Sequence, residues 1–261
     1  MEIPKVINYC WFGNGELSPL EKRCIDSWKK YCPDYKIIQW NEENFDIHQI
    51  PYMEQAYEKG KWAFVSDLAR YLILYKNGGL YFDTDVELTK PINDVIENGP
   101  FFGWEDNKYA NEPFYVNPGL GMAAYAGMPF YKTIIEYYKK HNFIDESGRI
   151  NQKTVCLITT ELLENDGMKS NGALQNIDGI VIYPIEYFCP MNKITGSINI
   201  TNNTVSIHHY SMSWQNKYER KIVELIRKYS STNIRAYNIL DKFKMVIYKI
   251  SNKAYKTIYK Q

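Results

Sequence analysis

The segment Trp62–Asp85, WAFVSDLARYLILYKNGGLYFDTD, contains a helix, the end of that helix and a strand in direct succession. Apolar residues lie almost all round the predicted helix, and the pair Gly78-Gly79 is a typical helix stop. Leu80–Phe82 then has the pattern of a short buried strand, which runs straight into Asp83 and Asp85. Because ligands of open α/β sheets bind at the carboxyl ends of strands, the segment predicts a site at these two carboxylates.

The residues before this segment predict a β-α-β opening. Lys5–Phe12 and Tyr35–Trp40 read as strands, and Ser18-Pro19 reads as the N-cap and first residue of a helix between them. Met53–Asn77 reads as two helical pieces with a break at Gly60. This alternation favours a parallel sheet with crossover helices.

The later part of the chain adds further strands and helices. The predicted strands are Phe101–Trp104, Gly119–Ala124, Ile180–Tyr183 and Val205–Tyr210, and the predicted helices are Phe130–His141 and Lys153–Asn165. The fold class is therefore α/β. We expect residues 1–216 to form one domain and residues 217–261 a basic helical extension packed on it.

Composition and charge exclude several classes of protein. With 261 residues, of which 45% are hydrophobic, the chain is a folded protein rather than a disordered one. Residues 217–261 carry 12 basic and 3 acidic side chains, whereas the first 216 carry 19 and 27. The basic end favours an anionic surface such as phospholipid, and the acidic body without a nucleic-acid motif argues against nucleic acid.

The cysteines and the apolar stretches indicate a cellular compartment. The five cysteines form no C-x-x-C pair, which favours free thiols in a reducing compartment. The N-terminus has no run typical of a signal peptide, and the long uncharged stretches are broken by polar residues, Gly or Pro. We expect a cytoplasmic protein.

Two acidic features are candidates for catalysis. Asp83 and Asp85 offer hard oxygen ligands for Mg²⁺ or Mn²⁺, although a solvated turn after a strand would show the same pattern. Asp67 and Arg70 share one face of the helix that precedes the strand. They fit either the binding of sugar hydroxyls or a plain intrahelical ion pair.

Histidine and aromatic residues supply further candidates. His208 and His209 end a late strand and would face opposite ways, so that only one of them would reach a metal, although two ordinary strand histidines would show the same pattern. Trp11 and Phe12 end the first strand, where a nucleotide base commonly binds in doubly wound folds, or they belong to the core. Trp214 either stacks on a ligand or packs.

Taken together, these motifs resemble the family of DXD-containing sugar-nucleotide glycosyltransferases. That family includes bacterial capsular polysaccharide enzymes and the yeast initiating mannosyltransferase, and the glucosyltransferase domains of clostridial toxins are more distant relatives. The motifs that carry the resemblance are Ile3–Ile7 with Tyr9–Gly13, Ser66-Asp67-x-x-Arg70, Gly78–Asp85, and His208-His209 with Ser213-Trp214.

The resemblance implies that residues 1–216 are a catalytic domain with a GT-A type fold, a Rossmann-like nucleotide-sugar-binding arrangement with a mixed central sheet. It also implies roles for single residues. Asp85 would be the main metal ligand, Asp83 would act through water or on the sugar or ribose, and one of His208 and His209 would complete the metal shell. The residues implied around the donor are Asp67, Arg70 and Asn117 at the sugar, Trp11 and Phe12 near the base, and Ser213 and Trp214 over the diphosphate.

The function implied is a retaining transfer of a hexose, with Mn²⁺ or Mg²⁺, from a nucleotide sugar that is UDP-linked. The acceptor would be a saccharide or lipid-linked oligosaccharide of capsular or surface polysaccharide synthesis, which the basic extension would approach at the inner face of an anionic membrane. One alternative is a haloacid-dehalogenase-like phosphatase with Asp83 as nucleophile, although its motif would come unusually late here. A second alternative is a glycan-binding protein without catalysis.

Overall fold

The computed structural model describes residues 2–105, 114–151, 153–193 and 195–212, together with residues 221, 224, 225, 227 and 228. The chain divides into two compact units, Met1–Pro190 with Asn199–His209 and Met191–Ile198 with Tyr210–Gln261. The predictions for Ser213, Trp214 and most of the basic extension lie outside the described residues. All the helices and strands discussed below belong to the first unit.

The predicted β-α-β opening is confirmed. Strand β1 (Val6–Cys10), helix α1 (Pro19–Tyr31) and strand β2 (Lys36–Trp40) follow one another, and β1 and β2 pair in parallel. The Ser18 side chain caps α1, and the Glu21 side chain accepts the Ser18 N–H in return. The N-cap signal in the sequence therefore marks the start of this helix correctly.

The segment that predicted the site folds as expected. Helices α2 (Pro51–Glu58) and α3 (Trp62–Asn77) are separated near Gly60, and strand β3 (Gly79–Tyr81) pairs in parallel with β1. Gly79 has a φ of +100°, and a Cβ there would lie 2.7 Å from the carbonyl oxygen of Val6. The turn from α3 into the sheet thus requires glycine.

The rest of the sheet is mixed. The further strands are β5 (Phe101–Glu105), β6 (Tyr115–Val116), β7 (Met122–Ala124), β8 (Gln175–Ile177) and β9 (Ile180–Tyr183). The strands of the whole sheet lie in the order β2-β1-β3-β7-β5-β9-β8, β6 pairs with β5, and β7 is antiparallel to β3. The predicted α/β class with a mixed central sheet is therefore confirmed.

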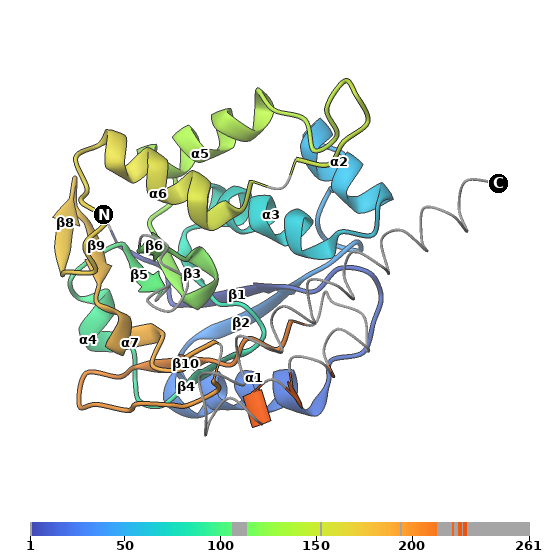
Figure 1. Ribbon diagram of the computed structural model, residues 1–261. Coiled ribbons are helices and arrows are strands. Elements are labelled where there is room, and N and C mark those ends of the chain that lie inside the picture. Colours follow the sequence, from blue (N-terminus) through green and yellow to red (C-terminus); the bar gives the residue numbers. More distant parts are fainter. Residues whose placement is uncertain are drawn as a thin grey trace. The chain divides into compact units, whose positions relative to one another are not determined.

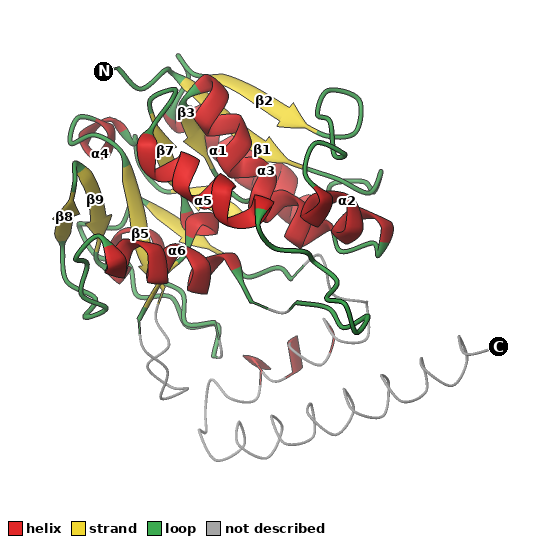
Figure 2. Cartoon of the chain, turned by 90° about the horizontal axis from the view of Figure 1, so that it is seen from above, coloured by secondary structure: helices red, strands yellow, loops and turns green. Residues whose placement is uncertain are grey.

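Helices cover the sheet and complete the core. Helices α3, α5 (Pro129–Lys139) and α6 (Val155–Asn165) lie on one side of the sheet, and α1 lies on the other (Figures 1 and 2). The short helices α4 (Asn93–Ile96) and α7 (Ile185–Phe188) join strands. No helix in the described part of the chain has the length and apolar character to cross a bilayer.

Two late features differ from or add to the prediction. The strand expected over Gly119–Ala124 is wrong in its first half, because Pro118–Leu120 forms a 3₁₀ turn that the Asn117 side chain caps. Strand β4 (Val86–Leu88) pairs antiparallel with β10 (Ser206–His208), in a second small sheet. This pairing connects the late histidine strand to the residues that follow β3.

Candidate active site

Asp83, Asp85 and His208 converge in the folded chain. Asp83 and Asp85 lie between β3 and β4, and the register of β10 on β4 places His208 opposite Val86. One ligand atom from each of the three side chains lies within 4.8 Å of the other two, and His208 Nε2 is 3.2 Å from Asp85 Oδ1. Two carboxylates and an imidazole in this arrangement can hold a divalent cation such as Mn²⁺.

Arg70 lies behind the carboxylates and holds two of them. Its Nη2 lies 2.9 Å from Asp67 Oδ1 and 3.1 Å from Asp83 Oδ1. Its Nε donates to the Ser66 carbonyl oxygen at 3.2 Å, and the guanidinium lies over the Tyr81 ring at 4.8 Å. The Arg70 side chain is only 4% exposed, whereas those of Asp67 and Asp83 are 15% and 29% exposed. Arg70 therefore orients the two carboxylates, and the carboxylates present the more accessible surface.

Burial and mutual repulsion perturb the titration of the site. Burial raises the pKa of Asp67 to about 7, with Arg70 opposing the shift and Asp83 adding to it. Burial also raises the pKa of Asp83, again opposed by Arg70. Burial would lower the pKa of His208, but the neighbouring carboxylates, Asp85 foremost, raise it overall. The cluster thus carries an excess of negative charge that a bound cation would relieve.

Asp83 rests against the backbone of Gly119. The Asp83 N–H donates to the Gly119 carbonyl oxygen at 3.2 Å, and Asp83 Oδ1 accepts the Tyr81 hydroxyl at 3.0 Å. A Cβ on Gly119 would lie 2.1 Å from Asp83 Oδ2. The position of this carboxylate therefore depends on the absence of a side chain at Gly119.

Glu105 is linked to this cluster through Asn117, and the sequence analysis did not predict it. It ends β5, it is 8% exposed, and its Oε2 accepts the Asn117 Nδ2 amide at 3.1 Å. Asn117 Oδ1 accepts the Gly119 N–H at 2.7 Å, so the amide that was expected to face the donor sugar bonds to the protein at both ends. The signal that points to Glu105 is the one that pointed to Asp83, an acidic residue directly after an apolar strand.

The two histidines have different partners. His209 Nε2 lies 2.7 Å from Glu87 Oε2, and Arg23 approaches the same carboxylate at 3.5 Å. The side chains alternate along the end of β10, so His208 faces Asp85 whereas His209 faces Glu87. Of the two candidate ligands, the structure brings only His208 together with Asp83 and Asp85.

Trp11 and Phe12, the two aromatic residues after β1, differ in their exposure. Trp11 is half-buried, and its indole N–H donates to the Gly15 carbonyl oxygen at 2.5 Å. Phe12 is buried and packs edge-on against Phe45. Trp11 therefore keeps accessible surface near the strand end, whereas Phe12 belongs to the core rather than to the surface where the donor was expected.

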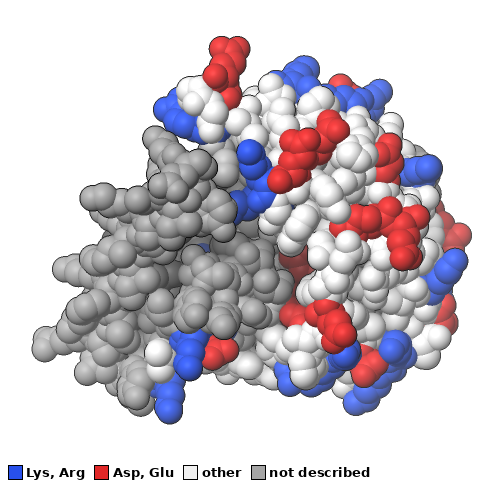
Figure 3. Space-filling view, turned by 90° about the vertical axis from the view of Figure 1, so that its right-hand side faces the viewer, with Lys and Arg blue, Asp and Glu red and all other residues white. Residues whose placement is uncertain are grey.

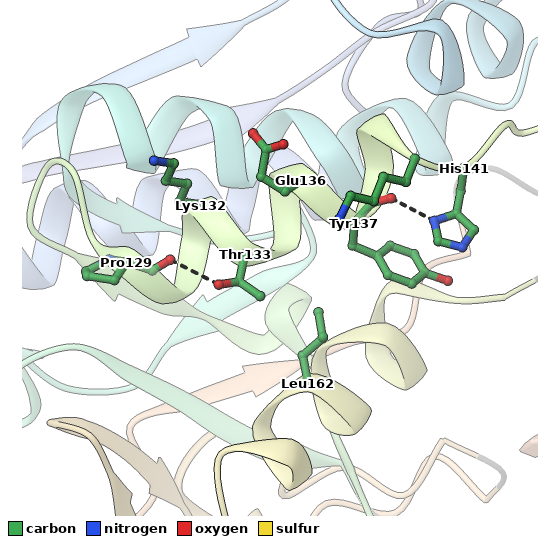
Figure 4. A pocket seen from close by; sticks show the side chains of 8 residues that line it. Pro129, Lys132, Thr133, Glu136, Tyr137, His141 and Leu162 are labelled. Atoms are coloured by element: carbon green, nitrogen blue, oxygen red, sulfur yellow. Dashed lines mark hydrogen bonds between the residues drawn. The ribbon is translucent and has the colours of Figure 1, made fainter.

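A cavity of about 510 Å³ lies elsewhere, between α5 and α6 (Figure 4). Its lining includes Lys132, Glu136 and Tyr137 of α5, His141 just after α5, and Leu162 of α6. The His141 ring nitrogen Nδ1 is bonded to the Tyr137 carbonyl oxygen at 2.7 Å. This cavity contains none of the carboxylates described above and is separate from the candidate site.

Comparisons with known proteins identify glycosyltransferases with similar sequences. A family model described as "Glycosyltransferase sugar-binding region containing DXD motif" matches residues 18–102. Inositol phosphoceramide mannosyltransferase 3 of Schizosaccharomyces pombe is 31% identical over 101 residues, which cover 36% of this chain and 27% of that protein. An uncharacterized glycosyltransferase, L373 of Acanthamoeba polyphaga mimivirus, is 26% identical over 234 residues, 83% of this chain and 90% of that protein.

Among solved structures, the PaToxG glycosyltransferase matches with a TM-score of 0.47 and 19% identity, over 63% of this chain and 70% of that one. The alignments with the first two S. pombe mannosyltransferases span only 27% and 39% of their lengths. The matched residues 18–102 include Asp67, Arg70, Asp83 and Asp85, on which the predicted resemblance rested. Through this region the chain is similar to the glycosyltransferase family whose sugar-binding region contains the DXD motif.

Proposed function

We propose that this chain is a glycosyltransferase that moves a hexose from a nucleotide sugar to a saccharide acceptor. The observation that carries the proposal is the convergence of Asp83, Asp85 and His208 within 4.8 Å, next to the Arg70–Asp67 pair. The family match over residues 18–102 supports it. The S. pombe relative is named as a mannosyltransferase, which makes mannose the first hexose to test.

We propose Mn²⁺ or Mg²⁺ as the cation of the site. Asp83, Asp85 and His208 would hold it, and their excess negative charge fits a divalent ion with phosphate oxygens in its remaining positions. When bound, the cation would neutralise charge that develops on the departing diphosphate.

Asp67 and Arg70 have separate roles in this proposal. Asp67, with 15% of its side chain exposed, orients hydroxyl groups of the donor sugar, and Arg70 fixes the direction of the Asp67 and Asp83 carboxylates from behind. This differs from the expectation that Arg70 contacts the donor itself, because the guanidinium is almost fully enclosed by its protein partners.

We infer that the reaction retains the anomeric configuration. The acceptor hydroxyl would attack on the face from which the diphosphate leaves, and a departing phosphate oxygen would take its proton. The partners of the carboxylates support this route over an enzyme nucleophile: Arg70 holds Asp67 and Asp83, and His208 lies against Asp85.

We further propose a UDP-hexose as donor, and a saccharide or lipid-linked acceptor of surface polysaccharide synthesis, on the basis of the resemblance to capsular enzymes. Contact with an anionic membrane rests on residues 217–261. On the face shown in Figure 3, the described acidic and basic side chains lie interspersed, and they form no extended basic area there. The extension is therefore the segment to delete when membrane binding is tested.

The geometry disfavours a phosphatase with Asp83 as nucleophile. Asp83 Oδ1 is bonded to both Arg70 and the Tyr81 hydroxyl, and Oδ2 faces the backbone of Gly119. A carboxylate held in this way is poorly oriented for in-line attack on a phosphate ester.

A donor screen tests the proposal. The purified protein is incubated with Mn²⁺ and a panel of UDP- and GDP-linked hexoses, and released nucleoside diphosphate is measured without acceptor. We expect slow release from one donor that is lost with chelator and in Asp85→Ala, but kept in Asp94→Ala, which removes an exposed carboxylate on α4. The proposal is wrong if no donor is turned over and none raises the melting temperature.

A further inference from the structure

A line of hydrogen bonds connects Glu105 to Asp83. Glu105 Oε2 accepts the Asn117 Nδ2 amide at 3.1 Å, and Asn117 Oδ1 accepts the Gly119 N–H at 2.7 Å. The Gly119 carbonyl oxygen in turn accepts the Asp83 N–H at 3.2 Å. The end of β5 is therefore linked by three successive hydrogen bonds to the backbone N–H of Asp83, the first acidic residue of the cluster.

Both side chains at the start of this line are fixed. Glu105 and Asn117 are each 8% exposed, and the pairing of β5 with β6 sets Glu105 opposite Tyr115. The Asn117 N–H donates to the Gly103 carbonyl oxygen at 3.0 Å. Asn117 is thus held by its backbone as well as by both atoms of its amide, and it has little freedom to turn toward a ligand.

The last of these hydrogen bonds joins Gly119 to Asp83, whose carboxylate is also in close contact with Gly119. Asp83 Oδ2 lies so close to Gly119 that a single added carbon would be 2.1 Å away. Any movement of the Pro118–Leu120 turn is consequently passed on to Asp83 by direct contact. Asn117 is the residue that caps this turn, and Glu105 is the residue that anchors the Asn117 amide.

We propose that Glu105 is a positioning residue, which acts through Asn117 and Gly119 to hold Asp83 where it binds the divalent cation. The inference rests on the proposed function, since it takes Asp83, Asp85 and His208 as the cation ligands. Partners that orient metal ligands from outside typically change metal affinity about 10- to 100-fold when they are removed. We expect losses of that size here.

The test is a titration of the full chain with Mn²⁺ alone, in which free Mn²⁺ is followed by electron paramagnetic resonance. Glu105→Ala should weaken the Mn²⁺ affinity about 10- to 100-fold. Glu105→Gln keeps an oxygen for the Asn117 amide and should stay within about threefold of the wild-type chain, because the bond is retained while the charge is lost. Thermal unfolding without metal shows that each variant is folded.

Two further variants separate positioning from general destabilisation. Asn117→Ser keeps a hydroxyl that can accept the Gly119 N–H but is too short to reach Glu105, and it should also lose about tenfold or more in Mn²⁺ affinity. Ser18→Ala removes the cap of α1, whose hydroxyl accepts the Leu20 N–H, and should leave the affinity unchanged.

The outcomes are distinct. Wild-type affinity in Glu105→Ala or Asn117→Ser would overturn the positioning role and leave the proposed function intact. Equal losses in Glu105→Gln and Glu105→Ala would also overturn it, because they would show that the charge acts rather than the hydrogen bond. If the wild-type chain bound no Mn²⁺ and released no nucleoside diphosphate in the donor screen, both the proposed function and this inference would be wrong.

Discussion

Substituting Gly119 by alanine tests whether the activity depends on the position of the Asp83 carboxylate. Gly119 is not in the left-handed region of φ, so its backbone accepts alanine without strain. The new Cβ would lie 2.1 Å from Asp83 Oδ2, whereas an ordinary contact begins near 3.4 Å. The carboxylate or the turn must therefore shift by about 1.3 Å.

The expected loss follows from that shift. Misplacing a reacting group by about 1 Å costs roughly 10²-fold in rate, which is about 2.7 kcal/mol of transition-state stabilisation. An overpacked core position usually costs about 1–3 kcal/mol in the free energy of unfolding. We therefore expect kcat/KM for donor hydrolysis to fall about 100-fold in a protein that remains folded.

The assay compares Gly119→Ala with Gly15→Ala. Gly15 also lies outside the left-handed region, and a Cβ there meets nothing within 4 Å, so that variant should match the wild-type chain. Nucleoside diphosphate release and Mn²⁺ affinity are measured for both variants beside their unfolding curves. Activity of Gly119→Ala within about threefold of the wild-type value would refute the argument that this contact sets the position of Asp83.

Three further predictions concern the charged residues. His208→Gln should weaken Mn²⁺ binding at least about tenfold, whereas His209→Gln should leave it nearly unchanged. The Mn²⁺ titration measures both affinities, and equal losses would contradict the assignment of His208 alone as a ligand. Arg70→Lys should lower kcat/KM about 100-fold and also lower the melting temperature, because the single Nζ of lysine does not reproduce the planar guanidinium, whose Nη2 holds both carboxylates while its Nε holds the Ser66 carbonyl oxygen. A lysine variant with normal kinetics would show that the positive charge alone suffices. Burial raises the pKa of Asp67 to about 7. Between about pH 4 and 7 the folded chain therefore binds more protons than the unfolded chain. Its free energy of unfolding should fall as pH rises through this window, by up to about 1.4 kcal/mol per pH unit. Asp67→Asn should flatten that slope in urea unfolding at pH 4.5, 6 and 7.5, and an unchanged slope would locate the titration elsewhere.

Local signals in the sequence determined the opening of the fold and the position of the carboxylates. The Ser18-Pro19 cap, the Gly78-Gly79 stop and the apolar strand before Asp83 act within a few residues along the chain, so they can be recognised without knowledge of distant partners. For the same reason the strand expected from Gly119 began too early, since the side chain of Asn117 competes for the backbone at that point.

Only the tertiary structure decided which distant residues join the site. The choice of His208 over His209 depends on the register of β10 against β4, two strands more than 110 residues apart in sequence. Glu105 is linked to Asp83 because its carboxylate holds the Asn117 amide, and the turn that Asn117 caps contacts Asp83. Arg70 stands behind the carboxylates because α3 packs on the sheet with that face inward. These are long-range contacts whose register a local pattern does not encode, because pairing partners are selected by packing of the whole sheet.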